Sequence, residues 1–166
     1  MRAQRRERFE AIYRENRQDV LAFLLRRCAQ PADAADLLHE VFVVAWRRIK
    51  YVPEGVAARM WLFGVAHRIL ANHRRAVKRR NLLVQQLGLE VSAATAPPEY
   101  PHVHEALAAL SEQDRAIVTM SAWERLTPSE IAVVIEMDPG AVRVRLHRAR
   151  ERLRQHLATS AAAVGG

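Results

Sequence analysis

Apolar residues recur every three or four positions along most of the chain, which is the spacing that places them on one face of an α-helix. Runs that alternate apolar and polar residues with the period of a β-strand are absent, and so are the Asn-Gly and Asp-Gly pairs that mark hairpins. The pattern therefore predicts an all-α protein. Helical segments are expected over residues 7–29, 31–50 and 56–80, again from residue 104, and twice within residues 127–157.

The stretch of residues 126–157 contains two helix starts. Thr127 and Glu130 are spaced as a capping box, with a proline at the first helical position between them. After a short break, Asp138 is placed to cap a second helix that again has proline, Pro139, at its first position. Two helices joined by a turn of three or four residues make a helix-turn-helix.

The second helix of this motif combines a narrow apolar stripe with a basic remainder. The stripe consists of Val142, Leu146, Ala149, Leu153 and Leu157. Between positions 139 and 155 there are six arginines and one acidic residue. The basic surface is either a solvated face or the DNA-contacting face of a recognition helix. We favour the recognition helix, because the guanidinium group of arginine can donate two hydrogen bonds to a phosphate or to the edge of a guanine in a major groove. The expected DNA contacts are Arg143, Val144, Arg145, His147 and Arg148.

The composition supports an anionic partner. The formal net charge of the 166-residue chain is +8, and every basic residue except Lys50 and Lys78 is arginine. This balance favours nucleic acid over a membrane surface.

The cysteine count and the hydropathy indicate the compartment. Cys28 is the only cysteine, so an intrachain disulfide is excluded, and a small buried side chain is expected there. The charged N-terminus is not followed by an apolar stretch typical of a signal peptide, and no apolar run approaches the ~20 residues of a membrane span. We expect a cytoplasmic protein without membrane insertion.

The segment of residues 31–50 carries two apolar stripes, although one is enough to pack a helix on its own domain. The first consists of Ala35, Leu38, Phe42, Ala45 and Ile49, and the second of Leu37, Val41 and Val44. Either the helix is fully buried, or the second stripe docks a partner protein. The candidate docking residues are Asp36, Leu37, His39, Glu40 and Val44.

The segment of residues 56–80 has an apolar face and a second, mixed face. The second face holds an aromatic ring, an amide and three guanidinium groups, beside Gly64, and such a ridge suits stacking, base-edge and phosphate contacts with a single strand. The alternative is that the tryptophan packs in the core and the arginines are solvated. The ridge consists of Trp61, Arg68, Asn72, Arg75 and Arg79.

Two small helical domains are expected, joined by a flexible linker. Residues 1–82 form the first domain, residues 83–103 the proline-containing linker, residues 104–158 the helix-turn-helix domain, and residues 159–166 a disordered tail. In the second domain Ser111 and Asp114 are expected to cap a helix. Its inward residues would be Ile117, Val118, Met120 and Trp123.

Four motifs, in order, resemble those of the extracytoplasmic-function sigma factors, the compact group of bacterial RNA polymerase sigma subunits. They read DAADLLHEVFVVAW, RMWLFGVAHRIL, ALSEQDRAIV and VRVRLHRARERLR. The resemblance covers residues 5–158. It implies a transcription initiation factor that binds core RNA polymerase and recognises the −35 and −10 promoter elements.

The resemblance also implies roles for particular positions. The helix around Leu37 and Glu40 would contact the polymerase clamp helices, the ridge would open the −10 element, and the recognition helix would enter the −35 major groove. Relatives often have an anti-sigma factor that covers both domains, and the sequence does not decide whether this chain has one. The chain departs from the family at Arg68, where asparagine is common, at Val144, where serine is common, and at Glu136, where the turn often has glycine. Val144 can make only apolar contact, for example with a thymine methyl group.

Two other functions compete with this interpretation. A stand-alone helix-turn-helix regulator would explain residues 104–158 but would leave the ridge unused, and no dimerisation element is evident. An enzyme would need a phosphate loop, a nucleophile or a metal site, and none is evident. His67 and His73 lie six positions apart, which does not suit one helical face, and His102 and His104 are expected in solvent. We therefore expect no enzymatic activity, metal, cofactor or small-molecule substrate.

Overall fold

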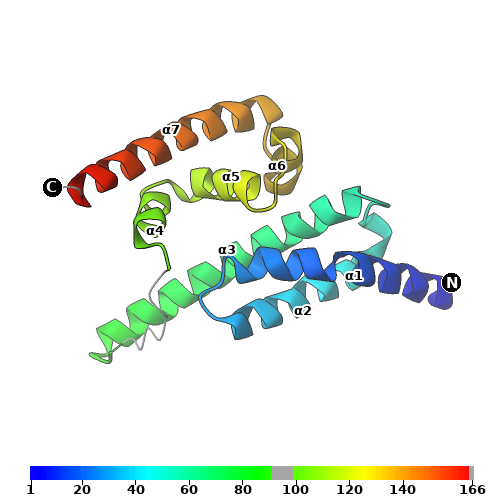
Figure 1. Ribbon diagram of the computed structural model, residues 1–166. Coiled ribbons are helices and arrows are strands. Elements are labelled where there is room, and N and C mark those ends of the chain that lie inside the picture. Colours follow the sequence, from blue (N-terminus) through cyan, green and yellow to red (C-terminus); the bar gives the residue numbers. More distant parts are fainter. Residues whose placement is uncertain (91–98, 165–166) are drawn as a thin grey trace. The chain divides into compact units, whose positions relative to one another are not determined.

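The computed structural model describes residues 1–90 and 99–164. Within these ranges the regular secondary structure is entirely helical (Figure 1). The all-α prediction is confirmed. The chain divides into two compact units, residues 1–95 and 96–166, which are described separately. The elements are α1 (Arg2–Leu25), α2 (Pro31–Arg47), the 3-10 helix η1 (Ile49–Tyr51), α3 (Ala57–Gln86), α4 (Pro101–Ala108), α5 (Glu112–Ala122), α6 (Pro128–Ile135) and α7 (Pro139–Val164). None of the helices in the described ranges has the length and apolar character that crossing a membrane requires.

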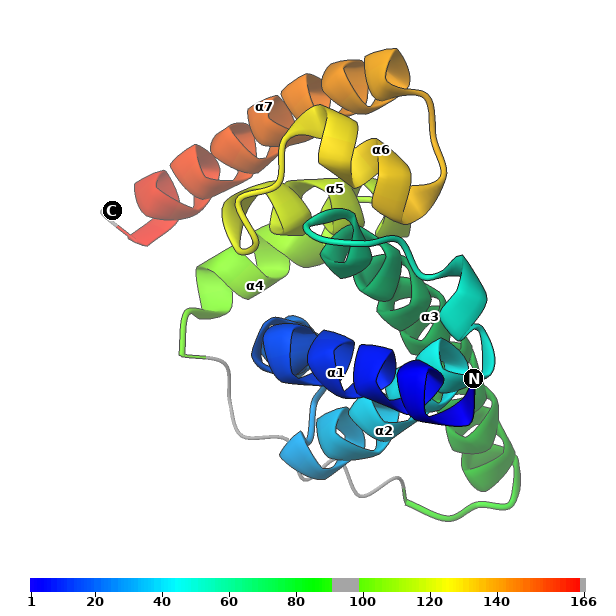
Figure 2. The same ribbon diagram turned by 90° about the vertical axis from the view of Figure 1, so that its right-hand side faces the viewer.

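The first unit is a bundle in which α1, α2 and α3 all contact one another (Figure 2). Its core is aromatic at the centre, where the rings of Phe23 and Phe63 stack with their centroids 4.9 Å apart. Around this pair, Leu24, Val41 and Leu62 are almost completely buried. Burying such side chains contributes about 1.5–3 kcal/mol each, which is the main force that holds the bundle together.

Helix α3 is longer than its partners can cover. It has 30 residues, whereas α2 has 17, so at 1.5 Å per residue the two helices are about 45 Å and about 26 Å long. All the buried side chains of α3 lie between Ala58 and Leu70. The later turns of α3 therefore stand beside the bundle rather than inside it.

The end of α3 corrects the expected start of the linker. Residues 83–86 are helical, and Gly88 follows with a φ of 70°. The amide of Gly88 donates to the carbonyl of Gln85 at 3.0 Å, and the amide of Leu89 donates to the carbonyl of Val84 at 3.1 Å, which is a Schellman motif. Glycine accepts this left-handed conformation without a Cβ clash, so Gly88 fixes where the helix stops. The remaining linker prediction falls largely on residues 91–98, which lie outside the described ranges.

The second unit contains the helix-turn-helix that its caps predict. The backbone amide of Thr127 donates to the Glu130 carboxylate at 3.0 Å, and the Glu130 amide donates to the Thr127 hydroxyl at 3.2 Å, so the capping box is confirmed. The Ala141 amide donates to the Asp138 carboxylate at 3.0 Å and starts α7. The cap of α5 is also confirmed, because the Asp114 amide donates to the Ser111 hydroxyl at 3.1 Å.

Three expectations for this unit are wrong in part. α4 begins at Pro101, which suits the first turn of a helix, rather than at His104. The predicted disordered tail is helical over residues 159–164, where α7 continues through three alanines, the best helix formers. Trp123 is 39% exposed rather than turned inward, because it lies at the C-terminal cap of α5, where the helix ends.

The turn between α6 and α7 has the left-handed shape that often requires glycine, although Glu136 occupies it. Its φ and ψ are 55° and 52°. A side chain in this conformation costs roughly 1–2 kcal/mol. The Met137 amide still donates to the Ala132 carbonyl at 3.0 Å, so the chain closes α6 in the usual way despite the glutamate.

Candidate nucleic-acid interface

The front of α7 exposes the residues that were expected to contact DNA. Val142, Leu146 and Ala149 are buried against the unit, and Arg143, His147 and Arg148 are exposed. Val144 is 49% exposed, which is unusual for valine and leaves its methyl groups available to a partner. Four of the five predicted DNA contacts, Arg143, Val144, His147 and Arg148, therefore share one outward surface of the first turns of α7.

Arg145, the fifth predicted contact, serves a different purpose. Its Nε donates to the Asp114 carboxylate of α5 at 2.8 Å, and Arg152 Nη1 reaches the second oxygen of the same carboxylate at 3.5 Å. The Asp114 side chain is only 10% exposed. Arg145 thus holds α7 on α5, and the expectation that it enters the groove is not supported.

Replacing Asp114 with alanine is expected to destabilise the second unit by about 1–3 kcal/mol, because two arginines lose the nearly buried carboxylate that they share. Urea unfolding of the chain, followed by circular dichroism, measures this loss. Glu112→Ala is the matched control, since it removes an exposed acidic residue from the same turn of α5. Equal stability of the two variants would mean that the Asp114 contacts contribute nothing to docking α7.

The ridge of α3 is also directed outward. Arg68, Asn72, Arg75 and Arg79 are exposed at spacings of three and four residues, and Arg75 Nη2 donates to the Asn72 side-chain oxygen. Trp61 is partly buried at the start of the ridge, and Gly64 beside it is buried. The structure thus brings the four polar members together on one face and leaves Trp61 partly buried at the start of that face.

On α2, the second apolar stripe is not a free docking surface. Leu37 is 4% exposed, Val41 is fully buried and Val44 is partly buried. The reason is that α2 packs against both α1 and α3, so it needs two apolar stripes. The expectation that Leu37 faces a partner is therefore wrong, and the same burial limits Val44.

The outward face of α2 is acidic and aromatic. Asp36, His39 and Glu40 are exposed. Further along the helix, Trp46 is 39% exposed and packs edge-on against Phe9 at 5.3 Å, with the Arg5 guanidinium 4.6 Å from the Trp46 ring centre. A face of this kind combines charge with a rigid aromatic anchor, which is common in protein interfaces.

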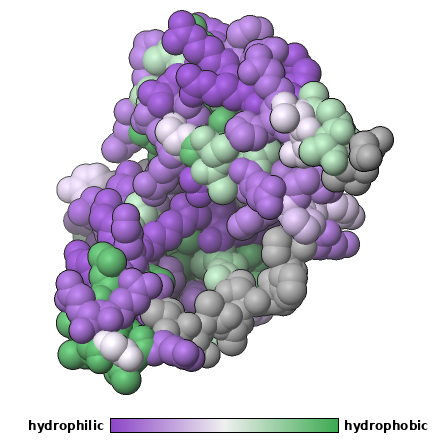
Figure 3. All heavy atoms as spheres, turned by 90° about the vertical axis from the view of Figure 1, so that its left-hand side faces the viewer, coloured by the Kyte–Doolittle hydropathy of each residue, from purple (hydrophilic) through white to green (hydrophobic). Residues whose placement is uncertain are grey.

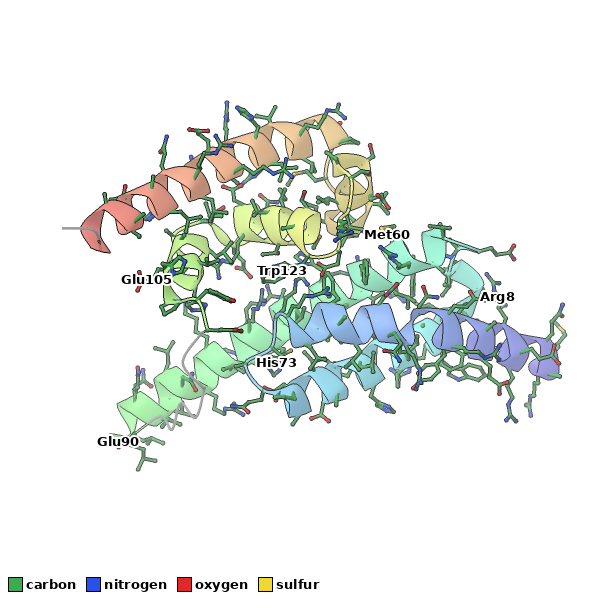
Figure 4. All side chains as sticks on the ribbon, viewed as in Figure 1. Arg8, Met60, His73, Glu90, Glu105 and Trp123 are labelled. Atoms are coloured by element: carbon green, nitrogen blue, oxygen red, sulfur yellow. The ribbon has the colours of Figure 1, made fainter. Side chains whose placement is uncertain are left out.

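Cys28 lies in a pocket at the α1–α2 turn, against α3. His73, labelled in Figure 4, projects from α3 near this turn, and its Nε2 lies 3.7 Å from the Asp33 carboxylate. Burial raises the pKa of the Cys28 thiol, and the charge of Asp33 raises it further against the opposing Arg74. The thiol therefore stays protonated at neutral pH and is a poor nucleophile. In the described ranges no three His, Cys, Asp or Glu residues are grouped so that they could hold a metal ion.

Comparison with known proteins gives matches to both units. The family described as Sigma-70 region 2 matches residues 12–80, and the family described as Sigma-70, region 4 matches residues 102–153. The ECF RNA polymerase sigma factor SigL of Mycobacterium tuberculosis is 30% identical over 154 residues, covering 87% of this chain and 85% of SigL. The RNA polymerase sigma factor YlaC of Bacillus subtilis is 27% identical over 164 residues, covering 93% of this chain and 95% of YlaC.

Two solved structures share the fold. The sigma factor RpoE of Bartonella quintana, crystallised with the anti-sigma factor NepR, superposes with a TM-score of 0.65 at 22% identity, covering 90% of this chain and 96% of that one. CnrH, in complex with the cytosolic domain of CnrY, gives a TM-score of 0.62 at 21% identity and covers 91% of this chain and 88% of CnrH. The region 2 match lies within the first compact unit, and the region 4 match lies within the second.

Proposed function

The chain belongs to the extracytoplasmic-function sigma factors of the sigma-70 family, and on that premise we propose which of its side chains contact the two promoter elements and the polymerase. As a sigma factor it binds core RNA polymerase and directs it to promoters. We infer that it acts without catalysis of its own, as an initiation subunit. We also infer that it works in the cytoplasm, where the polymerase meets the chromosome.

We propose that the front of α7 reads the −35 element. The observation that carries this assignment is the set of outward side chains opposite the buried stripe, just after the Asp138 cap. Arg143 and Arg148 have the donors for guanine edges or phosphates, and Val144 offers methyl groups to a thymine. Arg145 has no part in this contact, since it is bonded to Asp114.

The ridge of α3 is assigned to the −10 element. Arg68, Arg75 and Arg79 would hold the phosphates of the non-template strand, while Asn72 offers an amide to a base edge. The ring of Trp61, which is partly exposed, would stack against a base at the start of the ridge. The hydrogen bond from Arg75 to Asn72 would orient both side chains on the helix before DNA binds.

The outward face of α2 is assigned to core polymerase. Asp36, His39 and Glu40 would supply polar contacts, and Trp46 would be the apolar anchor beside them. Leu37 and Val44 pack inside the bundle beneath this face and are not assigned to the polymerase contact.

Arg75→Ala tests the −10 assignment. The variant loses a phosphate contact and the bond that orients Asn72, so we expect holoenzyme binding to fall about tenfold on a fork-junction DNA with a single-stranded −10 non-template strand. Fluorescence anisotropy of the labelled DNA measures the change. Arg80→Ala is the control, because Arg80 is exposed on the same helix but points away from the ridge. If both variants bind alike, the strand does not follow this face of α3.

A further inference from the structure

The final turns of α3 form an exposed arm, which we define as residues 76–89. No side chain of α3 beyond Leu70 is buried, and the bonds that join α3 to the α1–α2 turn involve residues earlier than this arm. Two of these bonds are the contact of His73 with Asp33 and the bond from Arg74 Nη2 to the Arg27 carbonyl at 3.4 Å. Within the arm Val77, Asn81 and Val84 are partly buried, and Val77 and Asn81 line the pocket at the α1–α2 turn, whereas the other side chains of the arm are exposed.

Four leucines of the arm lie open to solvent. Leu82 is 50% exposed, Leu83 56%, Leu87 66% and Leu89 60%. Ala76, Leu83 and Leu87 are spaced so that they share one face of the helix, and they continue the apolar stripe that is buried in the first half of α3. Figure 3 shows hydrophobic residues gathered at the lower left of the view. Contiguous apolar patches on a folded surface mark interaction sites more often than they occur by accident.

The leucines are held in place by the helix end. The Leu87 amide donates to the Leu83 carbonyl at 3.1 Å, and the Schellman bonds of Gly88 and Leu89 follow it. These bonds satisfy the last carbonyl groups, so the helix keeps its shape up to Leu87. A partner would consequently meet a preformed surface and lose little entropy in ordering it.

The charge beside the leucines identifies the kind of partner. Lys78, Arg79 and Arg80 are exposed on the turn before Leu83, and Arg79 and Arg80 lie on either side of the line from Ala76 to Leu83. Glu90, labelled in Figure 4, is the single acidic residue of positions 71–90 and lies past the helix end. The line of Ala76, Leu83 and Leu87, with Arg79 on one side and Arg80 on the other, is complementary to an amphipathic helix that has leucines on one face and carboxylates beside them.

We propose that the arm docks an acidic amphipathic helix of a partner protein, with that helix's apolar side chains on Leu83 and Leu87 and its carboxylates beside Arg79 and Arg80. A nucleic acid strand would use the arginines but would gain little from Leu83 and Leu87. A protein helix uses both. Arg79 is also assigned to the −10 strand, so in this respect the inference rests on the proposed function, and the strand and the partner helix would compete for Arg79.

A labelled synthetic peptide tests the proposal on the full-length chain. The probe is a 20-residue helix former with leucines at positions spaced by three and four and glutamates between them. We expect saturable binding by fluorescence anisotropy, and a loss of about tenfold or more for the double variant Leu83→Ser and Leu87→Ser. Arg79→Glu with Arg80→Glu should weaken binding similarly, and should favour a peptide in which lysine replaces each glutamate.

Two controls separate specific docking from nonspecific hydrophobic binding. Val56→Ser removes an 81% exposed apolar side chain from the other end of α3 and should leave binding unchanged. A peptide of the same composition with scrambled leucine positions should bind at least about tenfold more weakly. Absence of saturable binding, or equal binding of the scrambled peptide, would overturn the proposal. Loss of single-stranded DNA binding in the leucine variant, with peptide binding intact, would assign the arm to nucleic acid instead.

Discussion

Charge reversal at Asp36 and Glu40 together is expected to abolish association with core RNA polymerase while the first unit stays folded. Both side chains are exposed on the outward face of α2, so arginine can replace them without entering the core. At a polar interface the change removes two favourable contacts and places like charges together, which costs several kcal/mol, and affinity should fall about a hundredfold or more. Co-elution with core polymerase on size exclusion measures association, and circular dichroism checks helicity.

The matched control is Glu15→Arg with Glu54→Arg. It changes the net charge of the same unit by the same amount at two exposed positions away from the outward face of α2. This control should bind polymerase as the unmodified chain does. Normal association of the Asp36 and Glu40 variant would place the polymerase contact elsewhere. Leu37→Arg is unsuitable as a probe, because Leu37 is nearly buried and a charge there would disrupt packing.

Arg148→Ala should weaken binding to a −35 duplex by about ten- to a hundredfold, and the loss should appear at one base position. The physical reason is the removal of one bidentate base contact, which is worth about 1–3 kcal/mol. Anisotropy of holoenzyme on duplexes that vary each −35 base pair in turn measures both the loss and its position. The fold should be unaffected, because Arg148 is exposed opposite the buried stripe of α7.

Arg154→Ala is the control for Arg148. Arg154 is exposed on the same helix, and its Nη1 donates to Glu151 within the helix at 2.6 Å. The control changes the net charge equally and should leave −35 binding nearly unchanged. If Arg148→Ala binds every −35 variant as the unmodified chain does, the side chain does not enter the groove.

The features that could be predicted from the sequence are those that depend on neighbouring residues. The capping box of Thr127 and Glu130, the cap of α5 at Ser111 and the buried stripe of α7 each follow from side chains one to four positions apart. Gly88 was an equally local signal for the end of α3. The predicted helix end at residue 80 differs because the leucines after Arg80 lose the apolar periodicity that marks a buried helix face, although Gly88 marks the true end.

What could not be predicted depends on contacts between distant parts of the chain. Whether Leu37 faces a partner or the core depends on whether α2 has one neighbour or two, and periodicity within α2 is the same in both cases. Arg145 and Arg148 are equally basic positions on one helix, and only the position of Asp114, 31 residues earlier than Arg145, distinguishes their roles. Helical spacing identifies a face, but it does not identify what lies against that face.

Most of the arginines on α7 have hydrogen-bond partners within the second unit. Of the six between positions 139 and 155, four have partners there: Arg145 and Arg152 with Asp114, Arg150 with Ser121, and Arg154 with Glu151. Affinity for duplex DNA falls with salt by a slope of about −0.9 for each phosphate neutralised. Arg143, Arg148 and Arg150, whose charges are not paired with a carboxylate among the described residues, would contribute about −2.7, against about −5.4 for all six. Counterion release should therefore drive the −35 contact about half as strongly as all six arginines would. Recognition there should depend on base edges and persist as ionic strength rises.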